Sequence, residues 1–550
     1  MMKPLALICL IGIQTLSGAA GMVGNVTAGE CEDCQSTLAY LQAIAFIGDE
    51  AFVDMLQQRC GEPLDGDENF CRGVIALEGP VVADTLRKVK PSSRAAVLLC
   101  IALLGACQYP PVSPYNVSFP FDGRCHGLPL SEMSLMAVDK PSMMDNRKPL
   151  RIAHFSDLHV DLLYANYTLA DEPGHNDAPA ALFGDHNCGA PPNLEASMYQ
   201  AIQELLPDFS IFTGDIVDHA IWNTSARHNE MTIRSTYSAM NKAGMGTVYS
   251  TLVNHEMSPT NAVPSSRVGK SAQWLFNLAS NMWSRQMGTS SSSDIRTYGR
   301  YSVKHPGSKL RIISIHTNLY YTFNFWMYQV VDDPDPDNQF NGLSTNWTPP
   351  KEMVVNRYQS TIAAMFFGHT HLDQFKISYS DYQAQTAETA VSVSYIAPSL
   401  SPLSGMPAFR IYTVDPITFG VLDVETYTAD IARGGFDVQP IWSRTFSARK
   451  EYGSHVDPPL GDSLRSSELT PAFWHNVTRI LELNTTALDF YWARRTHGWN
   501  VQPCDLDCRK REICQLRAAR SQDNCHQLMP TNLLGRRHSS ERARSHELLA

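Results

Sequence analysis

Short apolar runs that end in polar, metal-capable side chains recur along the chain from Leu150. They read "LRIAHFSDLH", "DFSIFTGDIVDH", "GTVYSTLVNHE", "KLRIISIHTN" and "AAMFFGHTH". Runs of this length favour buried strands whose carboxyl ends carry the chemistry, as in layered α/β or sandwich folds. Three later segments, "AVSVSYIAPS", "AFRIYTVD" and "FGVLDVETYTA", predict a continuing sheet. The central part of the chain is therefore predicted to be a layered α/β domain.

Side chains able to bind a metal ion stand at four of these strand ends. They are Asp157 and His159, Asp215, Asn254 with His255, and His369 with His371. A single such residue more often hydrogen-bonds a turn than binds metal, but four ends together indicate a metal centre. Carboxylate, amide oxygen and imidazole suit zinc or manganese, and a carboxylate at the end of a central strand can bridge two ions. Two ions roughly 3.5 to 4 Å apart polarise a phosphoryl group and hold a hydroxide nucleophile between them.

A cluster of six cysteines precedes this domain. Its members are Cys31, Cys34, Cys60, Cys71, Cys100 and Cys107. The segments between them have helical periodicity and are too short to bury much alone, so disulfides are expected to stabilise them. A redox or zinc pair at "CEDC" is less favoured, because the other four cysteines are widely spaced and no histidines cluster nearby. The apolar run from Ala95 to Cys107 is shorter than the roughly 20 residues of a membrane-spanning helix, so a buried helix and no transmembrane segment are predicted.

The first 20 residues predict a secretory signal peptide, since a lysine, a short apolar run and small residues follow one another there. Removal of Cys9 with this peptide leaves twelve cysteines, an even number that suits disulfides in an oxidising compartment. Asn-x-Ser/Thr sequons fit the same route as predicted glycosylation sites. Their asparagines are Asn25, Asn116, Asn166, Asn223, Asn346, Asn476 and Asn484. The protein is therefore expected to be secreted and extracellular, or lysosomal.

The remaining segments have their own composition. Residues 112–149 are rich in Pro, Ser and Asp and predict a linker, in which Cys125 could pair with Cys188. Residues 455–527 have a helical pattern and hold a second group of cysteines, Cys504, Cys508, Cys514 and Cys525. Residues 528–550 predict a disordered basic tail. The net charge is −11 with no Lys/Arg excess outside that tail, so no nucleic-acid partner is expected. A monomer is expected.

The order Asp-x-His, Gly-Asp, Asn-His-Glu and Gly-His-x-His resembles the calcineurin-like metallophosphoesterases over residues 150–428. Within that superfamily, "GDIVDHAIW", "NHE", "FFGHTHLDQF" and "APS" are most similar to the acid sphingomyelinase family. The early cysteines resemble a saposin B-type domain over residues 29–111, which implies the pairs Cys31 with Cys107, Cys34 with Cys100, and Cys60 with Cys71. The implied fold class is a four-layer α/β (α+β) β-sandwich flanked by helices, preceded by an all-α saposin-like domain and followed by a helical region.

The resemblance implies a role for each metal-capable residue. Asp157, His159 and His371 would hold one zinc ion, Asn254 and His369 would hold the second, and Asp215 would bridge the two. His219 and His255 would be the acid candidates near the leaving oxygen. The implied reaction is hydrolysis of sphingomyelin to ceramide and phosphocholine by in-line attack of metal-bound hydroxide, at a membrane lipid surface. An imidazolium donor with a pKa near about 6.5 predicts an acidic optimum.

One part of the family pattern is missing. Between Phe323 and Phe367 the chain has no histidine, whereas family members carry a Gly-His-x-Pro-Pro motif whose histidine completes the second metal site. The acidic group "DDPDPD" contains prolines and predicts a solvated loop rather than a ligand set. Loss of one ligand is expected to weaken the second ion first. Two other readings stay open: a phosphoesterase for another substrate, and a lipid-binding protein with an incomplete second metal site and negligible turnover.

Overall fold

The computed structural model describes eight main segments of the chain, with a few single residues between them. The segments are 28–60, 68–108, 148–164, 180–289, 291–333, 358–433, 438–460 and 468–519. The predicted signal peptide, nearly all of the predicted linker and the basic tail lie outside the described residues. So do Asn25, Asn116, Asn166, Asn346, Cys125 and Cys525.

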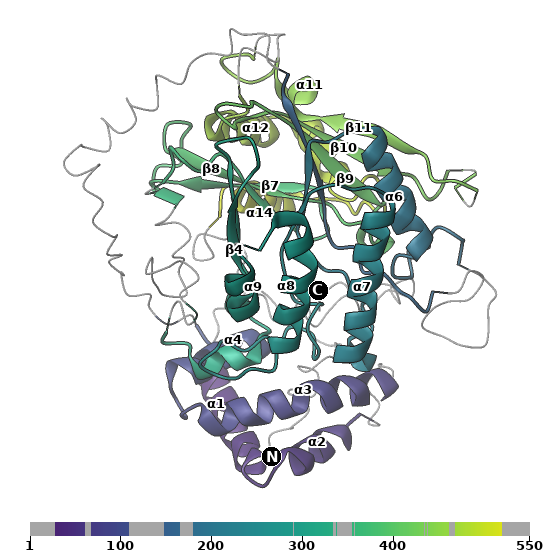
Figure 1. The fold of residues 1–550 in the computed structure, drawn as a ribbon. Helices are drawn as coiled ribbons and strands as arrows, with labels where there is room; N and C mark the ends of the chain where they lie inside the picture. The colour runs from purple at the N-terminus through teal and green to yellow at the C-terminus, as the bar shows by residue number, and fades with distance from the viewer. Residues whose placement is uncertain are drawn as a thin grey trace, which may run out of the picture.

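Four helices form the N-terminal part, shown in purple at the lower end of Figure 1. They are α1 (Ala28–Ala45), α2 (Asp49–Gln57), α3 (Glu68–Lys88) and α4 (Arg94–Leu104). Disulfides join Cys31 to Cys107, Cys34 to Cys100 and Cys60 to Cys71, which confirms the implied pairing. The Ser93 hydroxyl accepts from the Ala96 N–H at the start of α4, and Gly105 at φ 58° ends the helix. Among the described residues, no helix is both long enough and apolar enough to cross a membrane.

A six-stranded sheet forms the centre of the second part. Its strand order is β11-β10-β9-β1-β2-β3. The strands are β1 (Leu150–Phe155), β2 (Phe209–Phe212), β3 (Val248–Ser250), β9 (Ala408–Val414), β10 (Val421–Ala429) and β11 (Trp442–Ser447). The first three strands are parallel, and β9, β10 and β11 add antiparallel pairs. The parallel strands are almost wholly buried, as their continuous apolar runs require.

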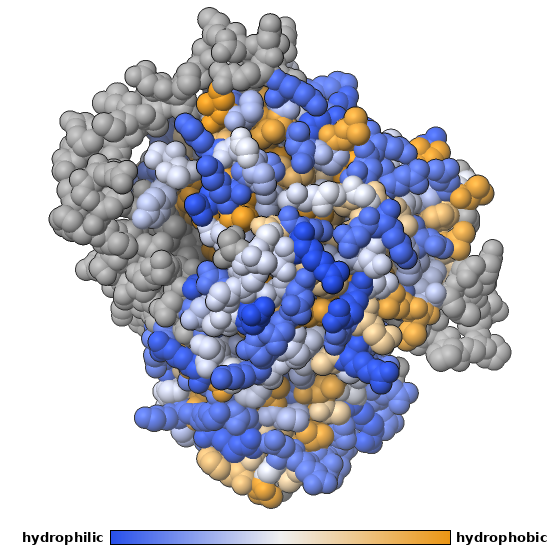
Figure 2. Space-filling model, viewed as in Figure 1, coloured by the Kyte–Doolittle hydropathy of each residue, from blue (hydrophilic) through white to orange (hydrophobic). Residues whose placement is uncertain are grey.

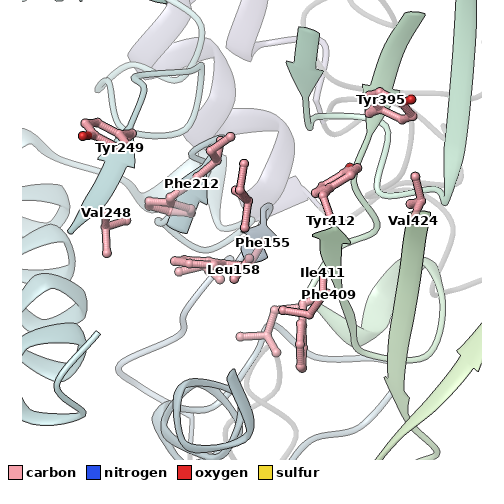
Figure 3. Close-up of a cluster of buried hydrophobic side chains, with 14 of the residues drawn as sticks. Phe155, Leu158, Phe212, Val248, Tyr249, Tyr395, Phe409, Ile411, Tyr412 and Val424 are labelled. Atoms are coloured by element: carbon pink, nitrogen blue, oxygen red, sulfur yellow. The ribbon is translucent and has the colours of Figure 1, made fainter. Parts of the chain in front are cut away.

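A second, three-stranded sheet packs on the first and has the order β6-β8-β7. Its strands are β6 (Met365–Phe367), β7 (Gln374–Tyr379) and β8 (Ala390–Ile396). The two sheets meet through aromatic rings: Phe366 lies 5.0 Å from Tyr412, and Tyr395 lies 5.3 Å from Tyr412, between ring centroids. Figure 3 shows Tyr395 and Tyr412 facing each other across this junction. The predicted sandwich is therefore present.

One predicted buried strand has a different place. The segment "KLRIISIHTN" forms β5 (Arg311–Ser314), which pairs with β4 (Tyr301–Lys304) in a separate two-stranded sheet. Ile313 on this strand is 64% exposed. The prediction that this strand is buried is wrong, because a two-stranded sheet has too few neighbours to bury both faces of a strand.

Helices cover both outer faces of the sandwich. The large sheet carries α6 (Pro192–Glu204), α7 (Ala226–Lys242) and α8 (Gln273–Met287), and α9 (Ser292–Tyr298) packs against α8 and β4. The small sheet carries α12 (Pro471–Leu483), α13 (Thr485–Arg494) and α14 (Leu506–Leu516), and short α11 (Ala448–Tyr452) follows β11. Trp474 of α12 donates from Nε1 to the Tyr395 hydroxyl of β8 at 3.0 Å. The predicted fold class of a four-layer sandwich between helical regions is confirmed.

The second cysteine group is partly bonded in the described residues. Cys504 pairs with Cys508, and Cys514 is also disulfide-bonded. Cys188 is buried. Its pairing with Cys125 stays a prediction.

The helical segment of α1 to α4 packs against two short 3-10 helices of the sandwich, η3 (Ile221–Asn223) and η5 (Phe325–Gln329). Thr85 of α3 donates from its hydroxyl to the Phe325 carbonyl at 3.1 Å. The backbone of α3 comes so close to η3 that a Cβ on Gly73 would lie 2.4 Å from the Trp222 carbonyl oxygen. The two parts therefore share one continuous apolar interface.

Candidate metal centre

The loops that follow β1 and β2 run side by side at the carboxyl ends of these strands. The Asp157 N–H donates to the Gly214 carbonyl at 2.8 Å, and the His159 N–H donates to the Asp215 carbonyl at 3.0 Å. The parallel pairing of the strands is thus extended by two residues into the loops. This extension places the carboxylates of Asp157 and Asp215 in one pocket.

Most of the predicted ligands have a left-handed backbone. Positive φ angles occur at Asp157 (52°), His159 (44°), Asp215 (59°), His369 (76°) and His371 (60°). Residues other than glycine seldom adopt this backbone conformation. Those that do cluster at functional sites, where the surrounding structure enforces it. The strands therefore turn sharply at their ends, and each turn brings a ligand-type side chain into the site.

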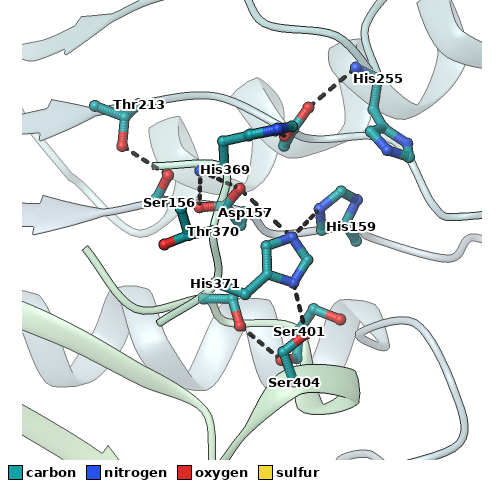
Figure 4. A network of polar contacts seen from close by, with 12 residues as sticks. Ser156, Asp157, His159, Thr213, His255, His369, Thr370, His371, Ser401 and Ser404 are labelled. Atoms are coloured by element: carbon teal, nitrogen blue, oxygen red, sulfur yellow. Dashed lines mark hydrogen bonds and ion pairs between the residues drawn. The ribbon is translucent and has the colours of Figure 1, made fainter. Parts of the chain in front are cut away.

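Backbone amides of two loops hold the carboxylates of two others. The His369 N–H donates to both carboxylate oxygens of Asp157, at 2.8 and 3.0 Å, and the His255 N–H donates to Oδ1 of Asp215 at 3.0 Å. Figure 4 shows both contacts. Gly368 makes the first of them geometrically accessible, because a Cβ there would lie 1.9 Å from the Ser156 hydroxyl oxygen. The loops after β1, β2, β3 and β6 are thereby tied together.

Six of the eight predicted site residues come together as a compact buried group. One ligating atom from each of Asp157, His159 and Asp215 lies within 4.8 Å of the others, and the same holds for His159, His219 and His371. Nε2 of His371 lies 3.0 Å from Nε2 of His159 and 3.6 Å from Oδ1 of Asp157. The sixth member, His255, has its ring centroid 4.6 Å from that of His159.

The histidine rings are oriented by bonds from their second nitrogen. Nδ1 of His159 donates to the Val217 carbonyl at 2.9 Å, and Nδ1 of His255 donates to the Asp218 carbonyl at 3.1 Å. Nδ1 of His371 lies 3.0 Å from the Ser404 hydroxyl. An imidazole whose Nδ1 carries the proton presents its Nε2 lone pair, which is the usual arrangement of a metal-ligating histidine. All three Nε2 atoms are then available to the site.

Burial decides the protonation of this group. It lowers the pKa of His371 to about 3 and the pKa of His159 well below its ordinary value, with neighbouring histidines adding to the effect on His159. Burial and then the charge of Asp215 raise the pKa of Asp157 well above its ordinary value. For Asp215, burial acts in the same direction, but the nearby imidazoles of His369 and His255 outweigh it and lower its pKa. The imidazoles of His159 and His371 are therefore neutral, and they lie beside the buried carboxyl groups of Asp157 and Asp215.

This donor set fits a divalent cation. Ionising both buried carboxyl groups side by side is costly unless a positive charge compensates them, and the neutral imidazoles of His159 and His371 supply none. Among the described residues, buried Oδ2 of Asp215 and Nε2 of His255 have no hydrogen-bond partner. Nitrogen and carboxylate oxygen ligands at this spacing suit zinc. Asp157, His159, Asp215 and His371 are therefore able to hold a metal ion.

The ligands predicted for a second ion are less tightly gathered. The His369 side chain is 34% exposed, against 3% for His371, and its Nδ1 lies 3.9 Å from Oδ2 of Asp215. Its ring stands edge-on to Tyr321, with centroids 5.1 Å apart. Asn254 is 4% exposed, and its Nδ2 has no hydrogen-bond partner among the described residues. This side of the site holds fewer mutual contacts than the side around His371.

The structure adds supporting residues that the sequence did not reveal. Asn229 of α7 is fully buried, and its amide lies 3.1 to 3.2 Å from the carbonyls of His255, Glu256 and Met257. Glu256 accepts from the Ile216 and Val253 N–H groups at 2.9 and 3.0 Å, joining the loops after β2 and β3. Glu256 stands inside the "NHE" stretch, so its place beside the ligands was a usable signal. No sequence signal marks Asn229, because its hydrogen-bond partners come from a different element.

The fold and the site together define a metallophosphoesterase domain. Residues 150–373 match the sequence model of the family described as "Calcineurin-like phosphoesterase". The match ends two residues after His371 and contains all eight predicted site residues.

Over more of its length the chain is similar to proteins named sphingomyelin phosphodiesterase. It is 27% identical to the Bos taurus protein over 401 residues, or 66% of this chain and 60% of that protein. It is 26% identical to the Homo sapiens protein over 437 residues, or 70% of this chain and 66% of that protein. For Caenorhabditis elegans sphingomyelin phosphodiesterase 1, 26% identity extends over 70% of this chain and 73% of the relative. The alignments thus cover less than two thirds of the bovine and human proteins. The resemblance to the acid sphingomyelinase family is confirmed.

Proposed function

We propose that the protein is a zinc-dependent phosphodiesterase that hydrolyses sphingomyelin to ceramide and phosphocholine and acts outside the cell or in lysosomes. The observation that carries the proposal is the buried group of Asp157, His159, Asp215 and His371, whose ligating atoms converge at metal-binding spacing. The relatives named sphingomyelin phosphodiesterase support the choice of substrate.

Each residue has a proposed role. Asp157, His159 and His371 would hold one zinc ion, Asn254 and His369 would hold the second, and Asp215 would be shared between the two. Bound zinc supplies the positive charge that polarises the phosphoryl oxygens and lowers the pKa of water at the site. The amides of His369 and His255 keep Asp157 and Asp215 in their ligand geometry.

Proton donation to the departing ceramide oxygen is assigned to His255 or His219. Nδ1 of His255 is engaged by the Asp218 carbonyl, so Nε2 is the atom that would carry the transferred proton. The His219 ring stacks on His159 with centroids 3.7 Å apart. An imidazolium donor requires protonation before the reaction, which supports an acidic working pH.

A lipid substrate agrees with the helical segment of α1 to α4. Tyr40 in α1 and Phe46 and Ile47 directly after that helix are 57%, 65% and 75% exposed. Figure 2 shows apolar residues on the surface of this lower part of the molecule. Exposed apolar side chains of this kind suit contact with a membrane lipid surface.

The proposal is tested by phosphocholine release. Purified protein loaded with zinc should hydrolyse sphingomyelin in mixed micelles faster than a soluble choline or nucleotide phosphodiester. Preference for the soluble ester would support a phosphoesterase for another substrate. No turnover of any ester would contradict the enzymatic proposal.

A lipid-binding protein with an incomplete second metal site is the second candidate. It is favoured by the exposure of His369 and by the absence of histidine from Phe323 to Phe367. This candidate requires less than two zinc ions per chain and negligible turnover, with binding to sphingomyelin vesicles retained. Metal counting on the same preparation that is assayed for phosphocholine release separates the two.

A further inference from the structure

A series of hydrogen-bonded, buried polar side chains crosses the large sheet from β9 through β1 to the ends of β1 and β2, beside the metal centre. Arg410 Nη1 donates to the Tyr412 hydroxyl at 3.3 Å, and this hydroxyl lies 3.1 Å from Nδ1 of His154. Nε2 of His154 lies 3.0 Å from the Thr213 hydroxyl, which donates to the Ser156 hydroxyl at 2.6 Å. None of these five side chains was predicted to have a role.

This series of hydrogen bonds ends beside Asp157, a proposed zinc ligand. Burial raises the pKa of Asp157 most, and hydrogen bonding from the adjacent Ser156 hydroxyl opposes that rise. The hydroxyl oxygens of Ser156 and Thr213 and Oδ2 of Asp157 all lie within 3.0 Å of the point where a Cβ on Gly368 would stand. Figure 4 shows the bond between Thr213 and Ser156 to one side of Asp157. Ser156, the last donor in this series of hydrogen bonds, therefore lies next to the metal centre.

The bond directions follow from Thr213. It donates its only hydroxyl proton to Ser156 and therefore accepts from Nε2 of His154. A neutral His154 that carries its proton on Nε2 accepts at Nδ1 from the Tyr412 hydroxyl, whose oxygen accepts from the Arg410 guanidinium. All donors therefore point from Arg410 toward Ser156, which directly precedes Asp157.

The environment keeps His154 in this neutral form. Arg410, Tyr412, His154, Thr213 and Ser156 are each between 0% and 6% exposed. Burial, followed by the charge of Arg410, lowers the pKa of His154 well below its ordinary value. A protonated ring would carry a second N–H, at Nδ1, that faces the Tyr412 hydroxyl. The oxygen of this hydroxyl already accepts a hydrogen bond from Arg410.

Arg410 also reaches the loop that carries His371. Its Nη2 donates to Oδ1 of Asp373 at 2.5 Å and to the Gln374 carbonyl at 3.1 Å. One side chain of β9 is thus bonded directly to the loop after β6 and indirectly to the loop after β1. These two loops supply Asp157, His159, His369 and His371.

We propose that Arg410, Tyr412, His154, Thr213 and Ser156 form a one-directional hydrogen-bond relay that orients Asp157 for metal binding, with His154 as the positioning residue that sets its direction. The inference rests on the proposed metal centre and extends it to residues that do not touch the metal. Bonds of this kind to a ligating group change metal affinity by about 10-fold to 100-fold in metalloproteins. Aligned hydrogen bonds also strengthen one another in a buried environment.

The test is zinc affinity, measured for the full-length protein by competition with a chromophoric chelator. Tyr412→Phe removes the oxygen that joins Arg410 to His154, and it should weaken zinc binding about 10-fold or more. Tyr395→Phe is the matched control, because Tyr395 is also buried, packs against Tyr412 and accepts one bond, from Trp474. It should lose similar stability in urea and keep wild-type zinc affinity.

A second pair of variants separates positioning from packing. His154→Phe keeps a flat ring against Phe366, whose centroid lies 5.4 Å away, but cannot donate to Thr213. His154→Gln keeps a donor and should recover part of the affinity that His154→Phe loses, although Phe is the better shape match. If His154→Phe does not fold, Tyr412→Phe alone carries the test.

The outcomes are distinguishable. Wild-type zinc affinity in Tyr412→Phe and in a folded His154→Phe would overturn the relay while leaving the metal centre intact. An equal loss in Tyr395→Phe would also overturn it, because general destabilisation would then explain the effect. No zinc binding by the wild-type protein would overturn both the relay and the proposed function.

Discussion

His369 donates its backbone N–H to both carboxylate oxygens of Asp157, although the two residues are 212 positions apart in sequence. Their side chains are proposed ligands of different zinc ions, so this bond couples the two halves of the site. It depends on the residue before His369, since Gly368 leaves only enough room for a hydrogen where Ser156 and Asp157 approach.

Gly368→Ala should therefore disrupt the metal centre. The added Cβ would lie 1.9 Å from the Ser156 hydroxyl and 2.7 Å from Oδ2 of Asp157, so the loop must move away. We expect zinc affinity to fall more than about 10-fold and the free energy of unfolding to fall by about 1 to 3 kcal/mol. Chelator competition and urea unfolding measure the two effects. Gly269→Ala is the control, because its Cβ would meet nothing closer than 3.9 Å; equal effects of both variants would contradict the explanation.

The two histidines of the "GHTH" stretch should differ in their effect on metal content. His371 is 3% exposed and lies against His159 and Asp157, whereas His369 is 34% exposed. His369→Ala should leave about one zinc ion per chain, and His371→Ala should leave less, because it removes a ligand from the more enclosed group. Elemental analysis after gel filtration measures the ratio. A larger zinc loss in His369→Ala would show that the exposed side of the site holds the tighter ion.

Gly73→Ala should weaken the contact between the helical segment and the sandwich. A Cβ at Gly73 would lie 2.4 Å from the Trp222 carbonyl, a backbone atom that cannot rotate aside, and Trp222 follows His219 by three residues. We expect a loss of about 1 to 3 kcal/mol in stability and lower turnover of both lipid and soluble esters. Gly79→Ala is the control in the same helix, since its Cβ would meet side chains alone, the nearest being Cγ2 of Val53 in α2 at 2.8 Å. Unchanged turnover in Gly73→Ala would show that the interface does not influence the site.

The raised pKa of buried Glu195 predicts that the protein loses stability as pH rises. Burial raises the pKa of this α6 residue to about 7 from an ordinary value of 4.5. The folded protein keeps the proton up to about pH 7 while the unfolded chain releases it near pH 4.5, so its contribution to stability is full below pH 4.5 and is lost as pH rises to 7. The change is on the order of 3 kcal/mol.

Glu195→Gln should flatten this dependence. The amide keeps an oxygen that can accept from the Tyr199 hydroxyl, which bonds to Glu195 at 2.9 Å. Urea unfolding at pH 5 and pH 7 should show a smaller difference in the variant than in the wild type. Exposed Glu204, in the last turn of the same helix, provides the control substitution Glu204→Gln. A variant that keeps the full wild-type difference would assign the pH dependence to other groups.

The sequence was sufficient to indicate which residues gather in the candidate metal centre and insufficient to indicate the residues that support them. Asp157, Asp215 and His371 could be proposed because each lies within four residues of the end of an apolar run, and a strand end has a fixed relation to its neighbours in a parallel sheet. Ser404 and Asn229 could not, because they reach the site from a 3-10 helix, η6 (Pro402–Ser404), and from α7, whose positions depend on tertiary packing. The same reason explains the place of β5: its pattern described a strand but not which strand would pair with it.

The loops at the strand ends also determine the stage of synthesis and folding at which this protein can bind a metal ion. The loop after β6 contributes His369 and His371, and it reaches Asp157 only when the small sheet has docked on the large one. A chain still emerging from synthesis has Asp157, His159 and Asp215 long before these two histidines exist. The full ligand set therefore arises late, after most of the sandwich is in place, and zinc capture would report completed folding rather than initiate it.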